Sequence, residues 1–352
     1  MGQPAIEEAH LTSLTAATAA RSSASSEHSL VVEDLRVHYD TPEGVIKAVD
    51  GVSLALKPGE RLALVGESGS GKSTLAMALM RLTKAPGRIV AGHIYLGGKD
   101  ITLLEEPEMR QLRLNEIALV PQGAMNSLNP VMRVKHQIID GILDHVADRK
   151  QTPDSHELEE RVNRLLARVG LSPEVGRMFP HELSGGMKQR VAMAIAISLS
   201  PRVIVADEPT SALDVVVQRQ IMQTLGRLQQ GLDAAVILIG HDMGLVAQFA
   251  NRVGVMYAGK LVELGPVQQI FTEPLHPYTK LLIESLPNLE EKKKFIGIPG
   301  LPPTLLRLPS GCVFHPRCPS FIKGTCETVA PHYQEVRPER ETSCHLYAGV
   351  RA

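Results

Sequence analysis

Short runs of consecutive apolar residues recur through the chain. They occupy residues 61–65, 203–206 and 236–239, and the first leads directly into a glycine-rich loop. Continuous apolar runs of this length are typical of strands in a parallel sheet whose two faces are both covered. A good helix-forming stretch, residues 75–80, follows the loop. The order strand, glycine loop, helix predicts an α/β fold with a parallel sheet.

Other segments carry alternating or helical patterns. Residues 30–39 alternate in part between apolar and polar side chains, and a turn sequence follows at residues 41–44. Apolar residues between 158 and 169 repeat at helical spacing until Gly170, which predicts an amphipathic helix. Residues 253–263 predict a hairpin. We therefore expect a helical middle region with strands on both sides of it in the sequence.

The composition limits the class of protein. With 352 residues, the chain is long enough for two domains, or for one large domain with an appendage. Its 43% of hydrophobic residues can build a core, whereas 37 Lys and Arg against 38 Asp and Glu argue against a globally basic nucleic-acid binder. Because no apolar run approaches 18 residues, we expect a soluble protein without a membrane span.

The N-terminal residues and the cysteines indicate a compartment. Residues 1–28 are rich in Ala, Ser and Thr, and they lack the positive start and apolar run of a secretory signal. We expect them to form a disordered tail. All four cysteines lie beyond residue 311, so the large domain has no disulfide framework. This distribution is typical of a reducing cytoplasm.

Residues 66–73 carry the clearest chemical motif. Their sequence, Gly-Glu-Ser-Gly-Ser-Gly-Lys-Ser, matches the phosphate-binding pattern G-x-x-x-x-G-K-[ST] at every fixed position. The glycines let backbone N–H groups face inward around phosphate oxygens, and the following helix points its positive N-terminus at the same anion. Lys72 can reach the β- and γ-phosphates, and the Ser73 hydroxyl can bind Mg²⁺. We expect a nucleoside triphosphate site here rather than a plain glycine-rich turn.

An acidic pair completes the expected magnesium site. Asp207 and Glu208 directly follow the apolar run at residues 203–206. A phosphate-binding loop of this kind needs a carboxylate at the end of another strand. We expect Asp207 to act on the magnesium ion and Glu208 to orient or deprotonate the water that attacks the γ-phosphate. The alternative is a pair of ordinary surface acids at a strand end.

Further motifs separate this chain from kinases, GTPases and helicases. Residues 183–190, Leu-Ser-Gly-Gly-Met-Lys-Gln-Arg, resemble the LSGGQ signature of ATP-binding cassette (ABC) ATPases. Gln122 resembles the Q-loop of that family, residues 211–214 resemble its D-loop, and His241 resembles its switch histidine. Tyr39 lies where the family places an aromatic side chain that stacks on adenine. All of these motifs occur in the family's order.

The resemblance implies an architecture. It predicts an α/β P-loop NTPase (RecA-like) core, an antiparallel β subdomain near the N-terminus and a helical subdomain at about residues 123–190. The ABC ATP-binding domain would span residues 29–270. The remaining residues, 271–352, would form a C-terminal extension.

The resemblance also implies contacts to ATP and Mg²⁺. The expected catalytic residues are Lys72, Gln122, Glu208 and His241. The expected contacts to the nucleotide are Tyr39, Gly66, Ser68, Gly69, Ser70, Gly71, Lys72, Ser73, Thr74, Gln122 and Asp207, of which Ser73, Gln122 and Asp207 would also contact Mg²⁺. Ser184, Gly185 and Gly186 precede a helix, which makes a second anion site. In the family, that second site faces ATP bound to the partner subunit, so two chains enclose two nucleotides.

Two positions depart from the family pattern. Met187 stands where the signature usually has Gln, and Gly240 stands where Ser or Thr commonly precedes the histidine. Neither departure removes a phosphate contact of the side chains named above. We therefore expect an active ATPase. In the alternative, a non-catalytic structural partner, Lys72, Glu208 or His241 would be replaced by another residue type.

The carboxyl end resembles one branch of the family, the dipeptide and oligopeptide importers. The resemblance is carried by His-Pro-Tyr-Thr at residues 276–279, Ile-Pro-Gly at 298–300 and the segment 311–319. It implies an ATPase peripheral to the cytoplasmic face of the inner membrane. Its partners would be two permease subunits, a second ATPase (homologous or identical) and an extracytoplasmic solute-binding protein. The alternative is a soluble regulatory or repair ATPase that is not coupled to transport.

The cysteines suggest a further cofactor. Cys312, Cys318, Cys326 and Cys344 lie within the last 41 residues, which we expect to form a separate small module. Four thiolates suit a tetrahedral zinc ion or one [4Fe–4S] cluster. The spacing lacks the C-x2-C pairs of zinc ribbons and does not match a ferredoxin. The family resemblance favours an iron–sulfur cluster with a structural role, with zinc, or four unrelated buried cysteines, as alternatives.

Overall fold

The computed structural model describes residues 27–123, 127–146, 153–286 and 297–349. The tail predicted at residues 1–28 lies almost entirely outside these ranges, and its predicted disorder stays a prediction.

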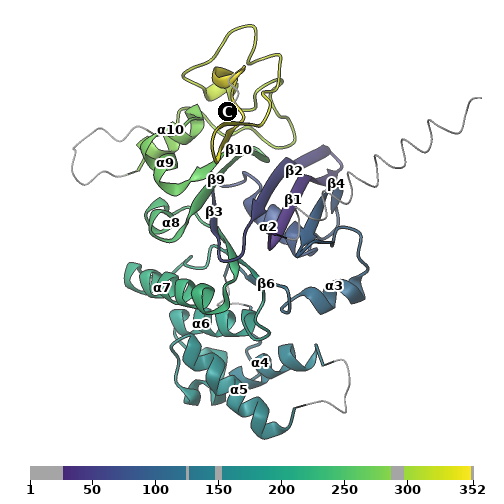
Figure 1. The fold of residues 1–352 in the computed structure, drawn as a ribbon, viewed down its shortest axis with the longest axis vertical. Coiled ribbons are helices and arrows are strands. Elements are labelled where there is room, and N and C mark those ends of the chain that lie inside the picture. The colour runs from purple at the N-terminus through teal and green to yellow at the C-terminus, as the bar shows by residue number, and fades with distance from the viewer. Residues whose placement is uncertain (1–26, 124–126, 147–152, 287–296, 350–352) are drawn as a thin grey trace, which may run out of the picture.

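An eight-stranded sheet forms the centre of the described structure (Figure 1). Its strands in spatial order are β11 (Gln334–Arg337), β12 (Arg340–Thr342), β10 (Lys260–Pro266), β9 (Arg252–Tyr257), β3 (Arg61–Val65), β8 (Ala235–Ile239), β7 (Val203–Asp207) and β6 (Ile117–Val120). The pairs from β9 to β6 are parallel, whereas β10, β12 and β11 continue the sheet in antiparallel fashion. The three apolar runs at residues 61–65, 203–206 and 236–239 thus correspond to strands β3, β7 and β8, and the predicted hairpin is β9–β10.

Both faces of the central strands are buried, which explains their continuous apolar runs. In β3, Leu62 and Leu64 belong to one hydrophobic cluster, whereas Ala63 and Val65 belong to a second cluster on the other face. All four side chains are fully buried. Burial of one Val or Leu side chain stabilises a fold by about 1.5–3 kcal/mol. The sheet therefore holds two hydrophobic layers together.

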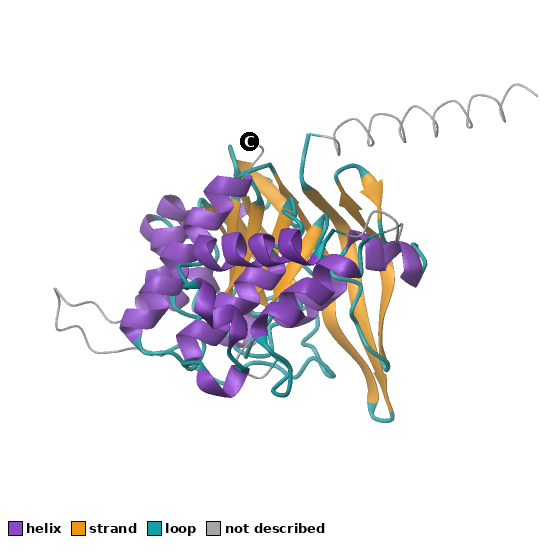
Figure 2. Ribbon diagram, turned by 90° about the horizontal axis from the view of Figure 1, so that it is seen from below, coloured by secondary structure: helices purple, strands orange, loops and turns teal. Residues whose placement is uncertain are grey.

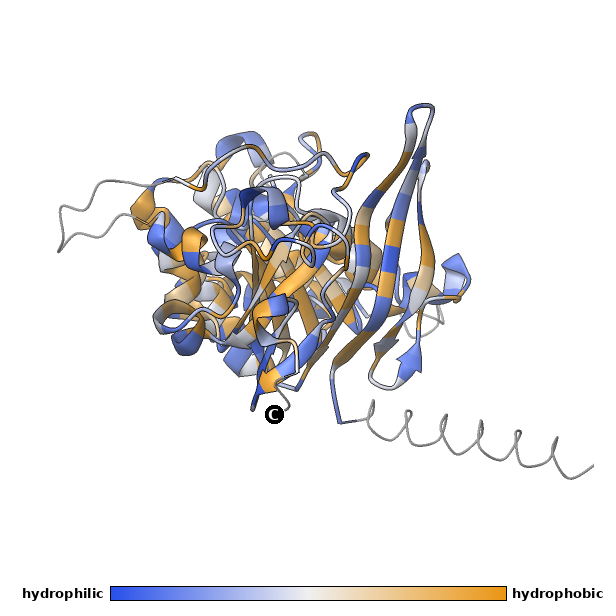
Figure 3. Ribbon diagram, turned by 90° about the horizontal axis from the view of Figure 1, so that it is seen from above, coloured by the Kyte–Doolittle hydropathy of each residue, from blue (hydrophilic) through white to orange (hydrophobic). Residues whose placement is uncertain are grey.

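A four-stranded antiparallel sheet covers one face of the main sheet. Its order is β2 (Gly44–Leu56), β1 (Leu30–Thr41), β4 (Gly87–Leu96) and β5 (Lys99–Asp100). The helix α2 (Lys72–Leu79) shares a hydrophobic cluster with both sheets. Figure 3 shows the alternation of polar and apolar residues along the long strands of this sheet. The predicted antiparallel β subdomain is confirmed.

Most of the remaining helices pack on the opposite face of the main sheet (Figure 2). They are α4 (Val134–Leu143), α5 (Ser155–Arg168), α6 (Gly185–Ala196), α7 (Val215–Leu232), α8 (Met243–Phe249), α9 (Val267–Thr272) and α10 (Pro277–Glu284), while α3 (Glu106–Leu112) follows the small sheet. The predicted amphipathic helix is α5, which buries Leu158, Val162, Leu165 and Leu166. In Figure 1, α4 and α5 lie at the end of the molecule opposite to the C-terminal residues. No helix of the described ranges is long and apolar enough to cross a bilayer.

The C-terminal residues do not form the separate module that we expected. Thr342 and Glu341 of β12 pair with Glu263 and Leu264 of β10, so β11 and β12 extend the main sheet. Our expectation was wrong because these strands are short and lack an apolar run, so their pairing with β10 leaves no pattern in the sequence. The division into domains at residue 270 stays a prediction.

Candidate functional site

The phosphate-binding loop connects β3 to α2, as predicted, and two of its glycines are required by close backbone approaches. Gly66 has φ +143°, and a Cβ there would lie 2.1 Å from the carbonyl oxygen of Met256 in β9. Gly71 has φ +102°, and a Cβ there would lie 2.1 Å from the carbonyl oxygen of Ala48 in β2. The loop is thus pressed between the two sheets, where a side chain would force it outward.

A cavity of about 430 Å³ opens beside this loop. It brings together most of the residues expected to contact the nucleotide, namely Tyr39, Ser68, Gly69, Ser70, Gly71, Lys72, Ser73, Thr74 and Gln122, along with Glu208. Tyr39 extends from β1, and its ring packs against Gly87, where a Cβ would lie 2.6 Å from the ring. The cavity is thus lined by an aromatic ring as well as by the loop and the first turn of α2.

Lys72 is nearly buried and bonds to its own loop. Its Nζ donates to the carbonyl oxygens of Gly66 (2.8 Å) and Glu67 (2.9 Å) and to Ser70 Oγ (3.1 Å). Burial lowers the pKa of Lys72, while the carboxylates of Glu208, Asp207 and Glu67 act in the opposite direction. Neutral carbonyl oxygens therefore bind the Lys72 ammonium group, and an anion such as a phosphate group would be a stronger partner.

Ser73 and Asp207 meet at the end of β7. The Ser73 hydroxyl donates to Asp207 Oδ1 at 3.2 Å. Burial raises the pKa of Asp207, the hydrogen bond from Ser73 lowers it, and nearby Glu208 raises it. A hydroxyl and a carboxylate are oxygen ligands of the kind that Mg²⁺ binds. The cation would also favour the ionised carboxylate.

Glu208 stands between two of the other expected catalytic residues. Gln122 Nε2 donates to Glu208 Oε2 at 2.9 Å, and His241 Nδ1 lies 3.7 Å from Glu208 Oε1. Glu208 has φ +43°, in the left-handed region that non-glycine residues seldom adopt. Such strain costs of the order of 1–3 kcal/mol and clusters at functional sites. The backbone thus orients this carboxylate at the expense of local strain.

The signature residues lie elsewhere, at the start of α6. The side chain of Ser184 caps this helix by accepting from Met187 N at 3.3 Å. Gly186 packs against α7, because a Cβ there would lie 2.6 Å from Val217 Cγ1. Neither these two residues nor Gly185 lines the cavity beside the phosphate-binding loop. An anion at this helix N-terminus would therefore lie outside the cavity.

The four cysteines are free thiols that lie near one another. Cys312 N donates to the carbonyl oxygen of Cys326 at 2.8 Å, and Ile322 N donates to Cys326 Sγ at 3.4 Å. Burial, together with the nearby thiols of Cys312, Cys318 and Cys326, raises the pKa of Cys344 to about 11. In the described ranges, no three His, Cys, Asp or Glu side chains are arranged to hold a single metal ion.

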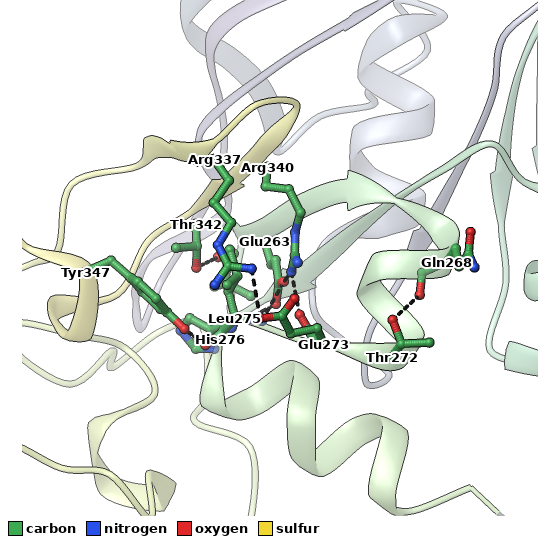
Figure 4. A network of polar contacts seen from close by, with 11 residues as sticks. Glu263, Gln268, Thr272, Glu273, Leu275, His276, Arg337, Arg340, Thr342 and Tyr347 are labelled. Carbon is green, nitrogen blue, oxygen red and sulfur yellow. Dashed lines mark hydrogen bonds and ion pairs between the residues drawn. The ribbon is translucent and has the colours of Figure 1, made fainter. Parts of the chain in front are cut away.

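A buried polar network fastens the C-terminal residues to β10 (Figure 4). Arg340 Nη2 donates to Glu263 Oε1 at 2.7 Å, and both side chains are fully buried. Glu263 also accepts from the backbone N–H groups of Leu275 (2.8 Å) and His276 (2.9 Å). His276 Nδ1 accepts from Tyr278 N, which caps α10. This network joins β10, β12 and α10 into one unit.

Sequence reasoning missed five residues that line the nucleotide cavity. These are Thr41, Ile46, Ala48, Pro86 and Leu305. Leu305 comes from the C-terminal extension, and its carbonyl oxygen accepts from Lys47 N at 3.4 Å. No local pattern could have revealed Leu305, because its role depends on how the extension folds back onto the hairpin β1–β2.

Comparison with known proteins agrees with this geometry. The family described as ABC transporter matches residues 49–211, and the family described as oligopeptide/dipeptide transporter, C-terminal region, matches residues 262–326. The dipeptide transport ATP-binding protein DppD of Caldanaerobacter subterraneus subsp. tengcongensis is 44% identical over 318 residues, which cover 90% of this chain and 96% of that protein. The oligopeptide transport ATP-binding protein OppD of Escherichia coli is 44% identical over 319 residues, covering 90% and 92%.

A solved structure shares the fold. The dimeric structure of the ATP-binding cassette MJ0796, in a post-hydrolysis state with ADP and Pi, superposes with a TM-score of 0.60 at 28% identity. The match covers 68% of this chain and 98% of that chain.

Proposed function

This chain belongs to the ATP-binding subunits of the dipeptide and oligopeptide ABC transporters, and we propose that it hydrolyses ATP in the cavity beside the phosphate-binding loop. It is an ATPase that powers peptide import. The alternative, a soluble regulatory or repair ATPase, is not favoured, since the importer-type C-terminal region is present. The observation that carries the site is the convergence of Lys72, Gln122 and Glu208 on one cavity.

We propose the following roles in hydrolysis. Lys72 leaves the carbonyl oxygens of Gly66 and Glu67 and binds the phosphates of ATP, whose charge is a stronger partner. Glu208 accepts a proton from the water that attacks the γ-phosphorus, and the bond to the β-phosphate oxygen breaks to release ADP and phosphate. Gln122 and His241, which flank this carboxylate, orient the water and the γ-phosphate.

Ser73, Asp207 and Gln122 are the proposed magnesium contacts. When bound, Mg²⁺ neutralises charge that develops on the phosphate oxygens. The hydrogen bond between Ser73 and Asp207 supports this assignment, because it holds two hard oxygen ligands side by side. Tyr39 would stack on the adenine ring, and residues 66–74 would surround the phosphates.

We propose that Ser184, Gly185 and Gly186 complete the nucleotide site of a second ATPase subunit. These residues begin α6 but do not line the cavity of their own chain. A helix N-terminus attracts anions. The dimeric state of the similar cassette MJ0796 with ADP and Pi supports a paired arrangement. The second subunit would be a homologue or another copy of this chain.

The remaining partners follow from peptide import. A peptide transporter needs a path across the bilayer, and no described helix of this chain could provide one. We propose two permease subunits as partners, an extracytoplasmic solute-binding protein in the complex, and peripheral attachment at the cytoplasmic face of the inner membrane.

We further propose that Cys312, Cys318, Cys326 and Cys344 bind a [4Fe–4S] cluster. Four free thiols that lie near one another support a shared cofactor. No three such side chains of the described ranges are arranged to hold a single metal ion, so the proposal rests on the four cysteines and on the family resemblance, with zinc as the alternative. Iron and sulfide near four each per chain in anaerobically purified protein would support the cluster, whereas zinc without sulfide would overturn it.

The assembled transporter tests the ATPase site. Glu208→Gln should bind ATP but lose about 10²-fold or more in turnover, because the attacking water has no base. Lys72→Ala should lose hydrolysis through weaker phosphate binding. Lys99→Ala, an exposed lysine outside the cavity, is the matched control and should keep normal turnover. Near-normal turnover by Glu208→Gln would remove this residue from the catalytic role.

A further inference from the structure

The C-terminal extension reaches the phosphate-binding loop itself. The Glu67 carboxylate, in the second position of the loop, accepts two hydrogen bonds from Arg317, with Nη1–Oε2 at 2.7 Å and Nη2–Oε1 at 3.0 Å. Arg317 lies 250 residues further along the chain, next to Cys318. Glu67 lines a neighbouring cavity of about 420 Å³ and not the nucleotide cavity. Two parallel bonds fix the orientation of a carboxylate as well as its distance.

Arg317 is itself held rigidly. Its Nε donates to the carbonyl oxygen of Pro299 at 2.8 Å, and its Nη1 also donates to Tyr257 Oη at 3.2 Å. Only 5% of the side chain is exposed. Hydrogen bonding to Glu67 raises the pKa of Arg317 above its ordinary value, so the guanidinium stays charged. Arg317 is therefore a buried, fixed positive charge that binds the Glu67 side chain of the loop.

An aromatic cluster forms the base of this contact. The rings of Tyr257 and Tyr278 lie 4.6 Å apart, and Phe314 lies 5.1 Å from the first and 5.4 Å from the second, measured between ring centres. These residues come from β9, from α10 and from the cysteine-bearing segment. All three are almost fully buried. Arg317 packs over the Tyr257 ring of this cluster, with its guanidinium carbon 5.8 Å from the ring centre.

The backbone of Glu67 connects this contact to the catalytic lysine. Its N–H donates to Tyr278 Oη at 2.9 Å, and its carbonyl oxygen accepts from Lys72 Nζ at 2.9 Å. The extension therefore binds both the side chain and the N–H group of Glu67, and the carbonyl oxygen of Glu67 binds Lys72. A shift of Glu67 would move the position of Lys72 and the direction of the loop N–H groups.

We propose that Arg317 is a positioning residue of the phosphate-binding loop, so that the C-terminal extension, acting through Glu67, sets the affinity for MgATP. The inference rests on the proposed nucleotide site. Loss of the Arg317 contact leaves the loop chemically complete but free to shift.

Titration of the full-length chain with MgATP tests the proposal. Arg317→Met and Glu67→Gln should each weaken binding about tenfold, a change of about 1.4 kcal/mol. Arg317→Lys should be intermediate, because it keeps the charge but not the paired geometry. The double variant should be no worse than either single variant, since both act through one contact. In the assembled transporter, KM for ATP should rise by the same factor while kcat changes little.

The matched control is Arg337→Met. It removes another arginine of the extension that pairs with a glutamate, Glu273 at 2.8 Å, but it does not touch the loop. Its affinity for MgATP should equal that of the wild type. The thermal midpoint of each variant without nucleotide separates lost affinity from lost folding.

Several outcomes would overturn the positioning role. The role is wrong if folded Arg317→Met and Glu67→Gln bind MgATP within twofold of the wild type, or if their effects multiply in the double variant. Should Arg317→Met fail to fold, Arg317→Lys and Glu67→Gln decide the matter alone. If the wild type itself does not bind MgATP, and Lys72→Ala changes nothing, the proposed nucleotide site fails instead.

Discussion

The C-terminal extension is tied to the ATP-binding core by two ion pairs that differ in their surroundings. Arg340 and Glu263 lie 2.7 Å apart, and both side chains are 0% exposed. Arg317 and Glu67 also lie 2.7 Å apart, but their side chains are 5% and 25% exposed, beside the phosphate-binding loop. The first pair is sealed between β10 and β12, whereas the second adjoins a site that would fill and empty with each ATP.

The two ion pairs therefore have different roles: the sealed pair attaches the extension to the sheet, whereas the pair at Glu67 positions the phosphate-binding loop. In the sealed pair, the Glu263 carboxylate is compensated by Arg340 and by two backbone N–H groups, and no part of the pair borders a nucleotide contact. A buried charge that loses its partner is strongly destabilising. The pair at Glu67 is partly hydrated, so its loss is less costly for folding. We therefore expect variants of the first pair to change stability and variants of the second to change affinity.

The largest effect should come from Arg340→Met. It leaves the Glu263 carboxylate buried without its cation, which we expect to lower the free energy of unfolding by about 3–5 kcal/mol. Urea denaturation of the full chain measures the loss. The double variant with Glu263→Gln should recover much of it, because no charge is then stranded. A loss below about 1 kcal/mol in the single variant would show that the pair is not the main attachment.

Tyr278→Phe should have a smaller effect. The hydroxyl accepts from Glu67 N at 2.9 Å, and its removal leaves a part-buried N–H without that partner. We expect a loss of about 1–3 kcal/mol in the free energy of unfolding, measured in the same denaturation series. An unchanged stability would mean that water replaces the hydroxyl, so that Tyr278 does not constrain the loop.

The sealed region should also respond to acid. Burial lowers the pKa of His276 to about 3, whereas an unfolded histidine titrates near about 6.5. As the pH falls, the unfolded state therefore binds a proton before the folded state does. The contribution of His276 to the free energy of unfolding is complete above about pH 6.5 and is lost as the pH drops toward 3. The slope is about 1.4 kcal/mol per pH unit within this window. His276→Asn, which can still accept from Tyr278 N, should show a correspondingly weaker loss of stability between pH 6.5 and 5.5.

The smallest effect should come from Arg337→Ala. Arg337 and Glu273 lie beside the sealed pair in Figure 4, but both are well exposed, so water and salt screen their attraction. We expect no measurable change in the urea midpoint. A large change would contradict the distinction between sealed and hydrated pairs, because proximity to the network would then matter more than burial.

Much of the nucleotide site could be predicted from the sequence because its chemistry is local. The loop at residues 66–73 needs glycines, a lysine and a hydroxyl at fixed spacing, and the acids must follow a buried strand. The structure brings residues 68–73 of the loop and Glu208 to one cavity, and Ser73 hydrogen-bonds to Asp207 beside it. Gln122, His241 and Tyr39 could be named only by resemblance to a family, because a single polar or aromatic residue carries no pattern of its own.

The contacts of the C-terminal extension could not be predicted in this way. Arg317 lies in the segment 311–319 that resembles the importers, but no pattern in the sequence pairs it with Glu67. The strands β11 and β12 are short and polar, so their sequence does not indicate that they continue the main sheet. Leu305 likewise gains its place at the nucleotide cavity only through the path of the folded chain.

The sequence by itself thus determined the α/β core, the phosphate-binding loop, the acidic pair and the family, since periodic burial and fixed motif spacing are recorded in neighbouring residues. Tertiary structure alone decided that Glu263 and Arg340 seal the extension to the sheet, and that Arg317 holds Glu67. These pairs join residues far apart in the chain. Their energies come from burial and from the direction of charged groups, and both exist only after the sheet and the extension have packed together.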